Sequence, residues 1–177
     1  MTKLRRKTAA VLSTAVLGAG AGCSSAHATV PAEFCKVSVE KDSLAPLIPN
    51  GSSIKQKYTA AEAQPGASCT LRVDGHQVLF VDIVRWDRAP DPVDWNKVGS
   101  PYKHAAQRPV SFPGYASIGS DHAIIQAKCN THTAYMSFAV YFSGDRVEDT
   151  PLGYKKLLRF INDFVPRETD KFGCTKN

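Results

Sequence analysis

Five histidines and scattered carboxylates are the side chains of this 177-residue chain that could carry acid–base or metal chemistry. Asp121 and His122 are neighbours, and consecutive strand residues point to opposite faces, so these two cannot form a hydrogen-bonded dyad in a strand. His122 and His132 could face each other across a hairpin. Asp82 lies in an apolar strand, where a carboxylate needs a partner or has a raised pKa. A secreted hydrolase built from Asp82, His122 and His132 is therefore one hypothesis, although such histidines usually have structural roles.

Sequence motifs give this hypothesis little support. The segment Gly114–Gly119 has the wrong spacing for a nucleophile elbow, and the glycines near residue 20 precede the folded part, so they form no phosphate loop. Cys129-x-x-His132 has a ligand-like spacing, but structural zinc sites pair two such units and the other cysteines are isolated. We expect no metal, no cofactor and no enzymatic activity.

A binding surface is the more natural expectation. Arg85, Trp86, Trp95 and Tyr102 cluster around a proline-rich loop, and Trp and Tyr in exposed loops are typical contact residues. The competing interpretation is that both tryptophans cap the open end of the core. We take these four residues as candidate contacts for a partner or a small ligand.

The N-terminus has the features of an export signal. Four basic residues occur before residue 8, and the next 15, Thr8–Gly22, are uncharged and too short to span a bilayer. Small residues then lead directly to Cys23, as in a bacterial lipobox. We expect residues 1–22 to be a lipoprotein signal peptide, Cys23 to be lipidated and residues 23–33 to form a tether. Cleavage after Ala28, giving a freely secreted protein, is the alternative. The pair Arg5-Arg6 leaves the export route open between the twin-arginine and the Sec pathway.

Removing this leader changes the charge. The whole chain has a net charge of +6, but the leader holds four of its 22 basic residues and none of its 16 acidic ones. The mature chain is therefore close to +2, and its densest basic cluster, Lys155-Lys156 with Arg159, is typical of a solvated helix face. Because nucleic-acid binding requires a concentrated basic surface, we exclude nucleic acid as a partner.

Four cysteines remain after Cys23 is removed from the thiol pool: Cys35, Cys69, Cys129 and Cys174. An even number in an exported domain predicts two disulfides. Three pairings exist, and Cys35–Cys69 with Cys129–Cys174 is favoured because it joins neighbours along the chain.

Residues 34–177 are expected to form a single α+β domain. Its sheet is antiparallel, with about five strands, and a short N-terminal helix and a C-terminal amphipathic helix lie on one face. The helices are expected at 42–48, at one turn near Trp95, and from Thr150-Pro151 to Pro166. In the central strand Leu79, Val81 and Ile83 form one face, and Val78, Phe80, Asp82 and Val84 the other. The expected strands are 54–58, 69–73 and 76–86 around the turn Asp74-Gly75, then 122–129 and 132–142 around the turn Asn130-Thr131.

The arrangement of these motifs resembles a known group of proteins. A leader ending in Cys, Phe34-Cys35 before a short helix, Ser68-Cys69-Thr70-Leu71-Arg72 entering a hairpin and Pro113-Gly114-Tyr115-Ala116 before a strand ending in Cys129 are similar to small actinobacterial lipoproteins of unknown function. More distantly, the chain resembles disulfide-bonded extracellular sensor domains of receptor kinases, a likeness of fold only. Neither resemblance implies a catalytic residue.

The leading hypothesis is a non-enzymatic lipoprotein at the outer face of the cell membrane. Cys23 attaches it to the membrane, and the domain binds an extracellular protein or a small ligand. The secreted hydrolase and a structural component of the envelope are the alternatives.

Overall fold

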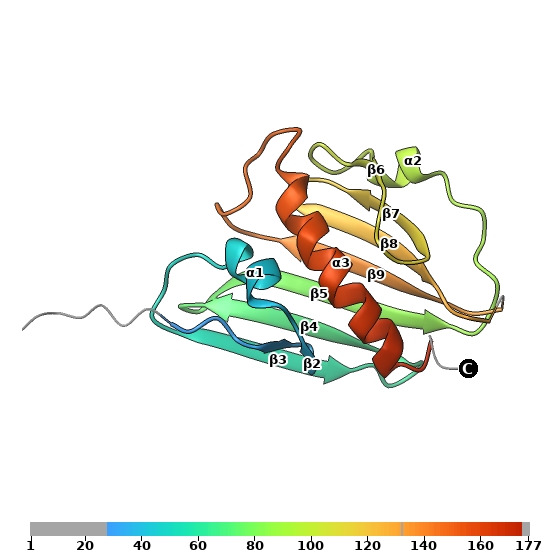
Figure 1. Ribbon diagram of the computed structural model, residues 1–177, viewed down its shortest axis with the longest axis horizontal. Helices are drawn as coiled ribbons and strands as arrows, with labels where there is room; N and C mark the ends of the chain where they lie inside the picture. Colours follow the sequence, from blue (N-terminus) through green and yellow to red (C-terminus); the bar gives the residue numbers. More distant parts are fainter. Residues whose placement is uncertain (1–27, 132, 175–177) are drawn as a thin grey trace, which may run out of the picture.

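A seven-stranded antiparallel sheet with helices on it forms the body of the protein (Figure 1). The structure, a computed structural model, describes residues 28–131 and 133–174. Cys23, the leader and His132 lie outside the described residues. The elements in chain order are β1 (Glu33–Phe34), β2 (Val37–Ser38), α1 (Lys41–Leu44), the 3-10 turn η1 (Ala45–Leu47), β3 (Ile54–Ala60), β4 (Gly66–Val73), β5 (His76–Trp86), α2 (Trp95–Gly99), β6 (Ala106–Arg108), β7 (Gly114–Ile118), β8 (His122–Lys128), β9 (Tyr135–Phe142) and α3 (Tyr154–Lys171).

Two meanders make up the sheet, in the order β3-β4-β5-β9-β8-β7-β6. The chain runs from the central strand β5 to the far edge at β6 and returns strand by strand, so that β9 pairs with β5. The α+β class, the antiparallel sheet and the C-terminal helix are confirmed, but the expected number of about five strands is wrong. The missed strands, β6 and β7, are three and five residues long, too short to show a clear alternation.

One face of the sheet carries the helical layer. α3 crosses it diagonally, with α1 beside it (Figure 1). Phe160 and Phe164 stack with ring centroids 5.0 Å apart, and Phe34 and Phe138 pack against Phe164 at 5.5 and 6.4 Å. These rings lie in the hydrophobic core between α3 and the sheet, and burying each contributes about 2–3 kcal/mol.

The boundaries of α3 differ from the expectation. The helix begins at Tyr154 and runs to Lys171, with Pro166 inside it, whereas a start at Thr150-Pro151 and an end at Pro166 were predicted. A proline inside a helix costs about 3 kcal/mol. The helix nevertheless continues beyond it because Val165 and Thr169, on either side of the proline, are both buried.

A β-bulge shows that the predicted alternation of side chains along β5 is wrong at Val78. The register shifts where Leu71 pairs with Leu79 and Arg72 with Gln77, which leaves Val78 without an opposite residue. Such a bulge turns two consecutive side chains toward the same side, and Val78 and Leu79 are both buried. Val78 therefore belongs to the core and not to the face of Phe80. That second face of β5 is also less covered than expected, since Asp82 is exposed.

Two disulfides join Cys35 to Cys69 and Cys129 to Cys174, the pairing that the sequence favoured. The first attaches the N-terminal hairpin to β4. Cys35 and Lys36 form the two-residue turn of this hairpin with φ of 58° and 63°, as tight hairpin turns require. The second disulfide attaches the segment after α3 to the end of β8.

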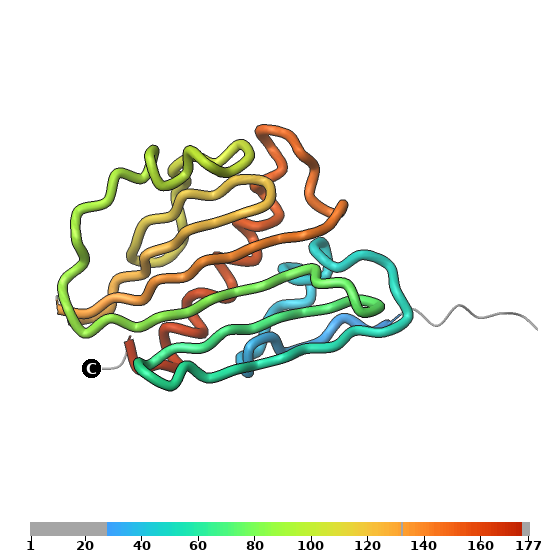
Figure 2. Tube along the Cα trace, turned by 180° about the vertical axis from the view of Figure 1, so that it is seen from behind, coloured from blue at the N-terminus to red at the C-terminus, as the bar shows by residue number. Residues whose placement is uncertain are grey.

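Among residues 28–131 and 133–174, no long helix lies on the opposite face of the sheet (Figure 2). The short helix α2 and the residues after it lie on this side, over β7 and β8: Gly99 is placed directly above the Ser117 hydroxyl, and Tyr102 stacks on His122. No helix among the described residues is long and apolar enough to cross a membrane.

Candidate functional site

Outward-facing side chains of the four strands β5, β9, β8 and β7 line up in rows across the face without α3. The pairing registers define four rows, which we call together the open face: Trp86, Tyr135 and Lys128; Val84, Ser137, Gln126 and Tyr115; Asp82, Ala139, Ile124 and Ser117; Phe80, Tyr141 and His122. Aromatic rings gather in the first and the last row, and apart from Tyr115 the two middle rows hold no aromatic side chain. The rings at the two ends differ in what surrounds them.

At the β5 terminus, Trp86 stacks on Tyr135 with centroids 6.2 Å apart and donates its indole N–H to the Ser137 hydroxyl at 2.9 Å. The Arg88 guanidinium lies 5.2 Å from the Trp86 ring. Tyr135 is largely buried, and with Lys128 it lines a cavity of about 220 Å³ whose other lining residues are Pro90, Cys129, Thr131 and Ala134. Trp86 is thus fixed in orientation while its ring stays partly exposed.

On the far side of Lys128 a second aromatic pair continues the same surface. Tyr115 is 40% exposed, and its ring lies 5.9 Å from that of Trp95 at the start of α2. Asp94 caps this short helix, since its carboxylate accepts the backbone N–H groups of the second and third residues after it. Tyr115 also lines a cavity of about 460 Å³ with Gln107, Arg108, Pro109, Val110 and Gly114.

Lys128 connects the two pairs. It lies opposite Tyr135 in the ladder, and its ammonium is 4.9 Å from the Tyr115 ring centroid. Among the described residues Lys128 forms no salt bridge. One continuous surface, called here the aromatic strip, therefore runs over β5, β9, β8, β7 and α2 and consists of Trp86, Tyr135, Lys128, Tyr115 and Trp95.

The rings at the other end of the open face are packed on one another. Tyr102 stacks on His122 at 3.5 Å, His122 meets Tyr141 edge-on at 4.2 Å, and Tyr141 lies 5.8 Å from Phe80. His122 is only 2% exposed, and this burial lowers its pKa from 6.5 to about 4, although Asp121 opposes the change. The imidazole is therefore neutral at pH 7, and Tyr102 serves as its cover.

The four residues predicted to form one contact surface therefore lie in different parts of the structure. Trp86 and Trp95 belong to the aromatic strip, whereas Tyr102 does not. Arg85 points to the helical side of the sheet, where its guanidinium donates to the Phe172 carbonyl at 2.8 Å and pairs with Asp87 at 3.1 Å. Arg85 therefore holds the end of α3 against β5.

Residues proposed for a hydrolase are not brought together among the described residues. Asp82 is exposed on β5 and His122 is buried on β8, with β9 between them. His122 begins β8, and His132 lies outside the described residues, so the pairing of these two histidines stays a prediction. No group of three His, Cys, Asp or Glu side chains suited to a metal ion occurs in the part of the chain that the structure describes.

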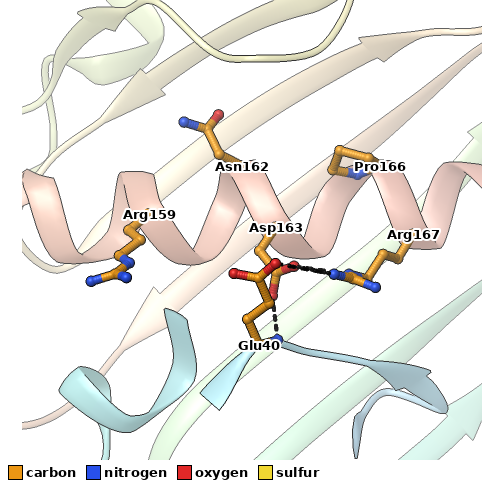
Figure 3. A pocket seen from close by; sticks show the side chains of 6 residues that line it. All are labelled: Glu40, Arg159, Asn162, Asp163, Pro166 and Arg167. Atoms are coloured by element: carbon orange, nitrogen blue, oxygen red, sulfur yellow. Dashed lines mark hydrogen bonds and ion pairs between the residues drawn. The ribbon is translucent and has the colours of Figure 1, made fainter. Parts of the chain in front are cut away.

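A groove on the helical side has a structural explanation. It encloses about 400 Å³ between α3 and the segment before α1, and Figure 3 shows its six lining residues, Glu40, Arg159, Asn162, Asp163, Pro166 and Arg167. Its central carboxylate accepts hydrogen bonds from the backbone of Glu40, the hydroxyl of Ser43 and the guanidinium of Arg167 at 2.7–2.8 Å. Burial works against this charge, but the three donors outweigh it and lower the pKa of Asp163. These contacts fasten α1 to α3.

Three members of the strip were missed by sequence reasoning. Tyr115 lies in the missed strand β7, and Lys128 and Tyr135 are each ordinary residues of a strand. Their common signal is that all three occupy outward positions, but the cross-strand register that brings them together cannot be read from one strand. The predicted turn Asn130-Thr131 also implied a register two residues different from the pairing of Lys128 with Tyr135.

Comparison with known proteins adds no relative to this description. No family model matches the chain, and no curated protein or solved structure is significantly similar to it.

Proposed function

We propose that this chain is an exported protein, held at the outer face of the cell membrane by a lipid on Cys23, and that it acts by binding rather than by catalysis. The basic, uncharged and small-residue segments before Cys23 support export. The two disulfides support an oxidising location, because such bonds persist mainly outside the cytosol. The aromatic strip is the contact surface of this proposal.

The observation that carries the binding function is the continuity of the strip. Five side chains from five elements lie side by side on the face without α3, and their neighbours fix several of them in orientation. Trp and Tyr are the residues that most often dominate binding energy, because they bury a large rigid area at little entropic cost.

The experiment has two parts that use the same preparation. Mass spectrometry of the N-terminal peptide, from the full chain expressed in a bacterium that exports it, should find an acylated Cys23; Cys23→Ala should leave the protein unacylated. An unmodified peptide beginning at Thr29 would contradict the anchor and identify cleavage after Ala28.

The second part uses intrinsic fluorescence, since both tryptophans of the chain belong to the strip. Purified glycan, lipid and protein fractions of the envelope are added separately, and one of them should change the emission saturably. The response should weaken in Tyr115→Ala but persist in Phe80→Ala, a matched loss of an aromatic ring on the same face outside the strip. Emission that responds to no fraction would refute a binding role for the strip.

A further inference from the structure

We infer that the aromatic strip binds a glycan strand bearing carboxylate groups, of the kind found in a bacterial cell wall. The faces of its sugar rings stack on the aromatic rings, and one carboxylate pairs with Lys128. This inference rests on the binding function proposed above and adds the chemical class of the ligand.

Stacking is the first requirement, and the strip meets it with the accessible rings of Trp86, Trp95 and Tyr115, while the largely buried Tyr135 supports Trp86. An aromatic ring carries partial negative charge on its face, which suits the slightly positive C–H groups on the face of a pyranose. Since adjacent strands lie about 4.8 Å apart, the four strands beneath the strip span about 14 Å. That length fits several sugars in a row. The cavities of about 220 and 460 Å³ lie along its course, one lined by Tyr135 and the other by Tyr115.

Charge is the second requirement. Lys128 lies in the middle of the strip, exposed and without a salt bridge among the described residues. A cationic ligand would be repelled there, and a neutral ligand would leave the ammonium unused. A carboxylate on the ligand supplies the missing partner.

Position in the molecule favours a polymer over the lipid surface. The described chain begins at Ala28, whose N–H donates to Gly51 beside the β4–β5 turn, and this turn lies at the opposite end of β5 from Trp86 (Figure 1). Eleven residues of strand cover about 36 Å. An anchor on Cys23, five residues before Ala28, would therefore attach at the end of the sheet remote from the strip. Membrane docking also needs several basic residues, each worth about 1 kcal/mol, and the strip has one.

Two tetrasaccharides that differ only in the 3-O-lactyl groups, which carry the carboxylates, provide the test. One alternates N-acetylglucosamine and N-acetylmuramic acid, and the other is the chitin tetramer, which has the same backbone without the acidic groups. The full-length protein in detergent is titrated with each, and tryptophan emission is followed. Both should bind saturably, and the acidic sugar should bind up to about fivefold more tightly, since an exposed ion pair contributes at most about 1 kcal/mol. In Lys128→Met, which keeps the apolar stem, this preference should fall to about one.

Further variants test whether sugar binding depends on the strip or on other parts of the open face. Trp86→Ala should weaken binding of both sugars more than tenfold, with Trp95 still reporting, because a central aromatic contact commonly carries that much affinity. Phe80→Ala, on the same strand and face but outside the strip, should bind as the native chain does. Thermal unfolding of each variant verifies that the fold persists.

Three results would overturn the inference: emission that neither sugar changes, a carboxylate preference that survives Lys128→Met, or binding to phosphatidylglycerol vesicles that depends on Lys128 while the sugars have no effect. The proposed function fails separately. A strip that ignores both sugars but responds to another envelope fraction refutes only the ligand class, and an unacylated Cys23 refutes only the anchor.

Discussion

Replacing Glu168 by Gln should uncover a pH dependence of stability that the native chain conceals. Glu168 is completely buried, and this burial raises its pKa from 4.5 to about 7, although Lys171, with its Nζ 3.1 Å from Oε2, opposes the rise. The folded carboxyl therefore keeps its proton at pH values where the unfolded one has lost it. Its contribution is fully present below pH 4.5 and is lost as the pH rises through 7, an effect of about 3 kcal/mol.

His122 changes the free energy of unfolding with pH in the opposite direction. Its pKa falls from 6.5 to about 4 because the ring is buried, so the unfolded state takes up a proton where the folded state does not. Its contribution is complete above pH 6.5 and is lost as the pH falls through 4, again by about 3 kcal/mol. Between pH 4.5 and 6.5 the two slopes have equal size and opposite sign. Asp163, whose pKa is lowered, contributes its change only at lower pH.

Urea unfolding with intact disulfides, at half-unit steps from pH 4.5 to 6.5, measures the two slopes. The native free energy of unfolding should stay nearly constant, while that of Glu168→Gln should rise by about 3 kcal/mol with increasing pH. His122→Phe, which keeps a ring between Tyr102 and Tyr141, should fall by a similar amount, and the double variant should again be flat. A profile of Glu168→Gln parallel to the native one would refute the assignment of the raised pKa to this carboxyl.

Three further changes test the framework. Replacing Cys129 and Cys174 together by Ser should lower the free energy of unfolding by about 4 kcal/mol, since the closed loop spans 45 residues; an unchanged urea midpoint would contradict this. Asp163→Ala leaves three donors without their acceptor and should lower the free energy of unfolding by about 3 kcal/mol. A decrease below about 0.5 kcal/mol would show that these hydrogen bonds do not hold α1 against α3. Arg85→Met removes the bond to the Phe172 carbonyl; hydrogen exchange of the last turn of α3 should then accelerate, and sugar binding by the strip should not change.

The parts of the fold that could be predicted depend on local signals. The hairpin of β4 and β5 has a two-residue turn, Asp74-Gly75, with φ of 49° and 84°, and its strands alternate clearly over many residues. The single turn near Trp95 also followed from nearby residues, and the disulfide pairing followed from the order of the cysteines along the chain. The strands β6 and β7 could not be predicted because they are only three and five residues long, although each pairs with a strand close to it in the sequence.

The candidate site was predictable only in part, because its residues come from different strands and meet only through the register between those strands. Trp86 and Trp95 were found because tryptophan is rare and both lie beside prolines. Tyr102 and Arg85 share that neighbourhood in the sequence, but one packs on a buried ring and the other on a backbone carbonyl of the opposite face. Lys128 gave no signal, since its importance arises from Tyr115 on the neighbouring strand.

Charged groups on the two faces of the sheet differ in whether they already have partners within the chain. This difference indicates which face binds the ligand. On the helical face a groove of about 400 Å³ surrounds Asp163, whose carboxylate already accepts three hydrogen bonds from the chain itself. A ligand there would have to displace contacts that hold two helices together. On the open face the Lys128 ammonium touches an aromatic ring but has no anionic partner among the described residues. A carboxylate that reaches it adds an interaction and breaks none, so binding at the strip requires no rearrangement of the core.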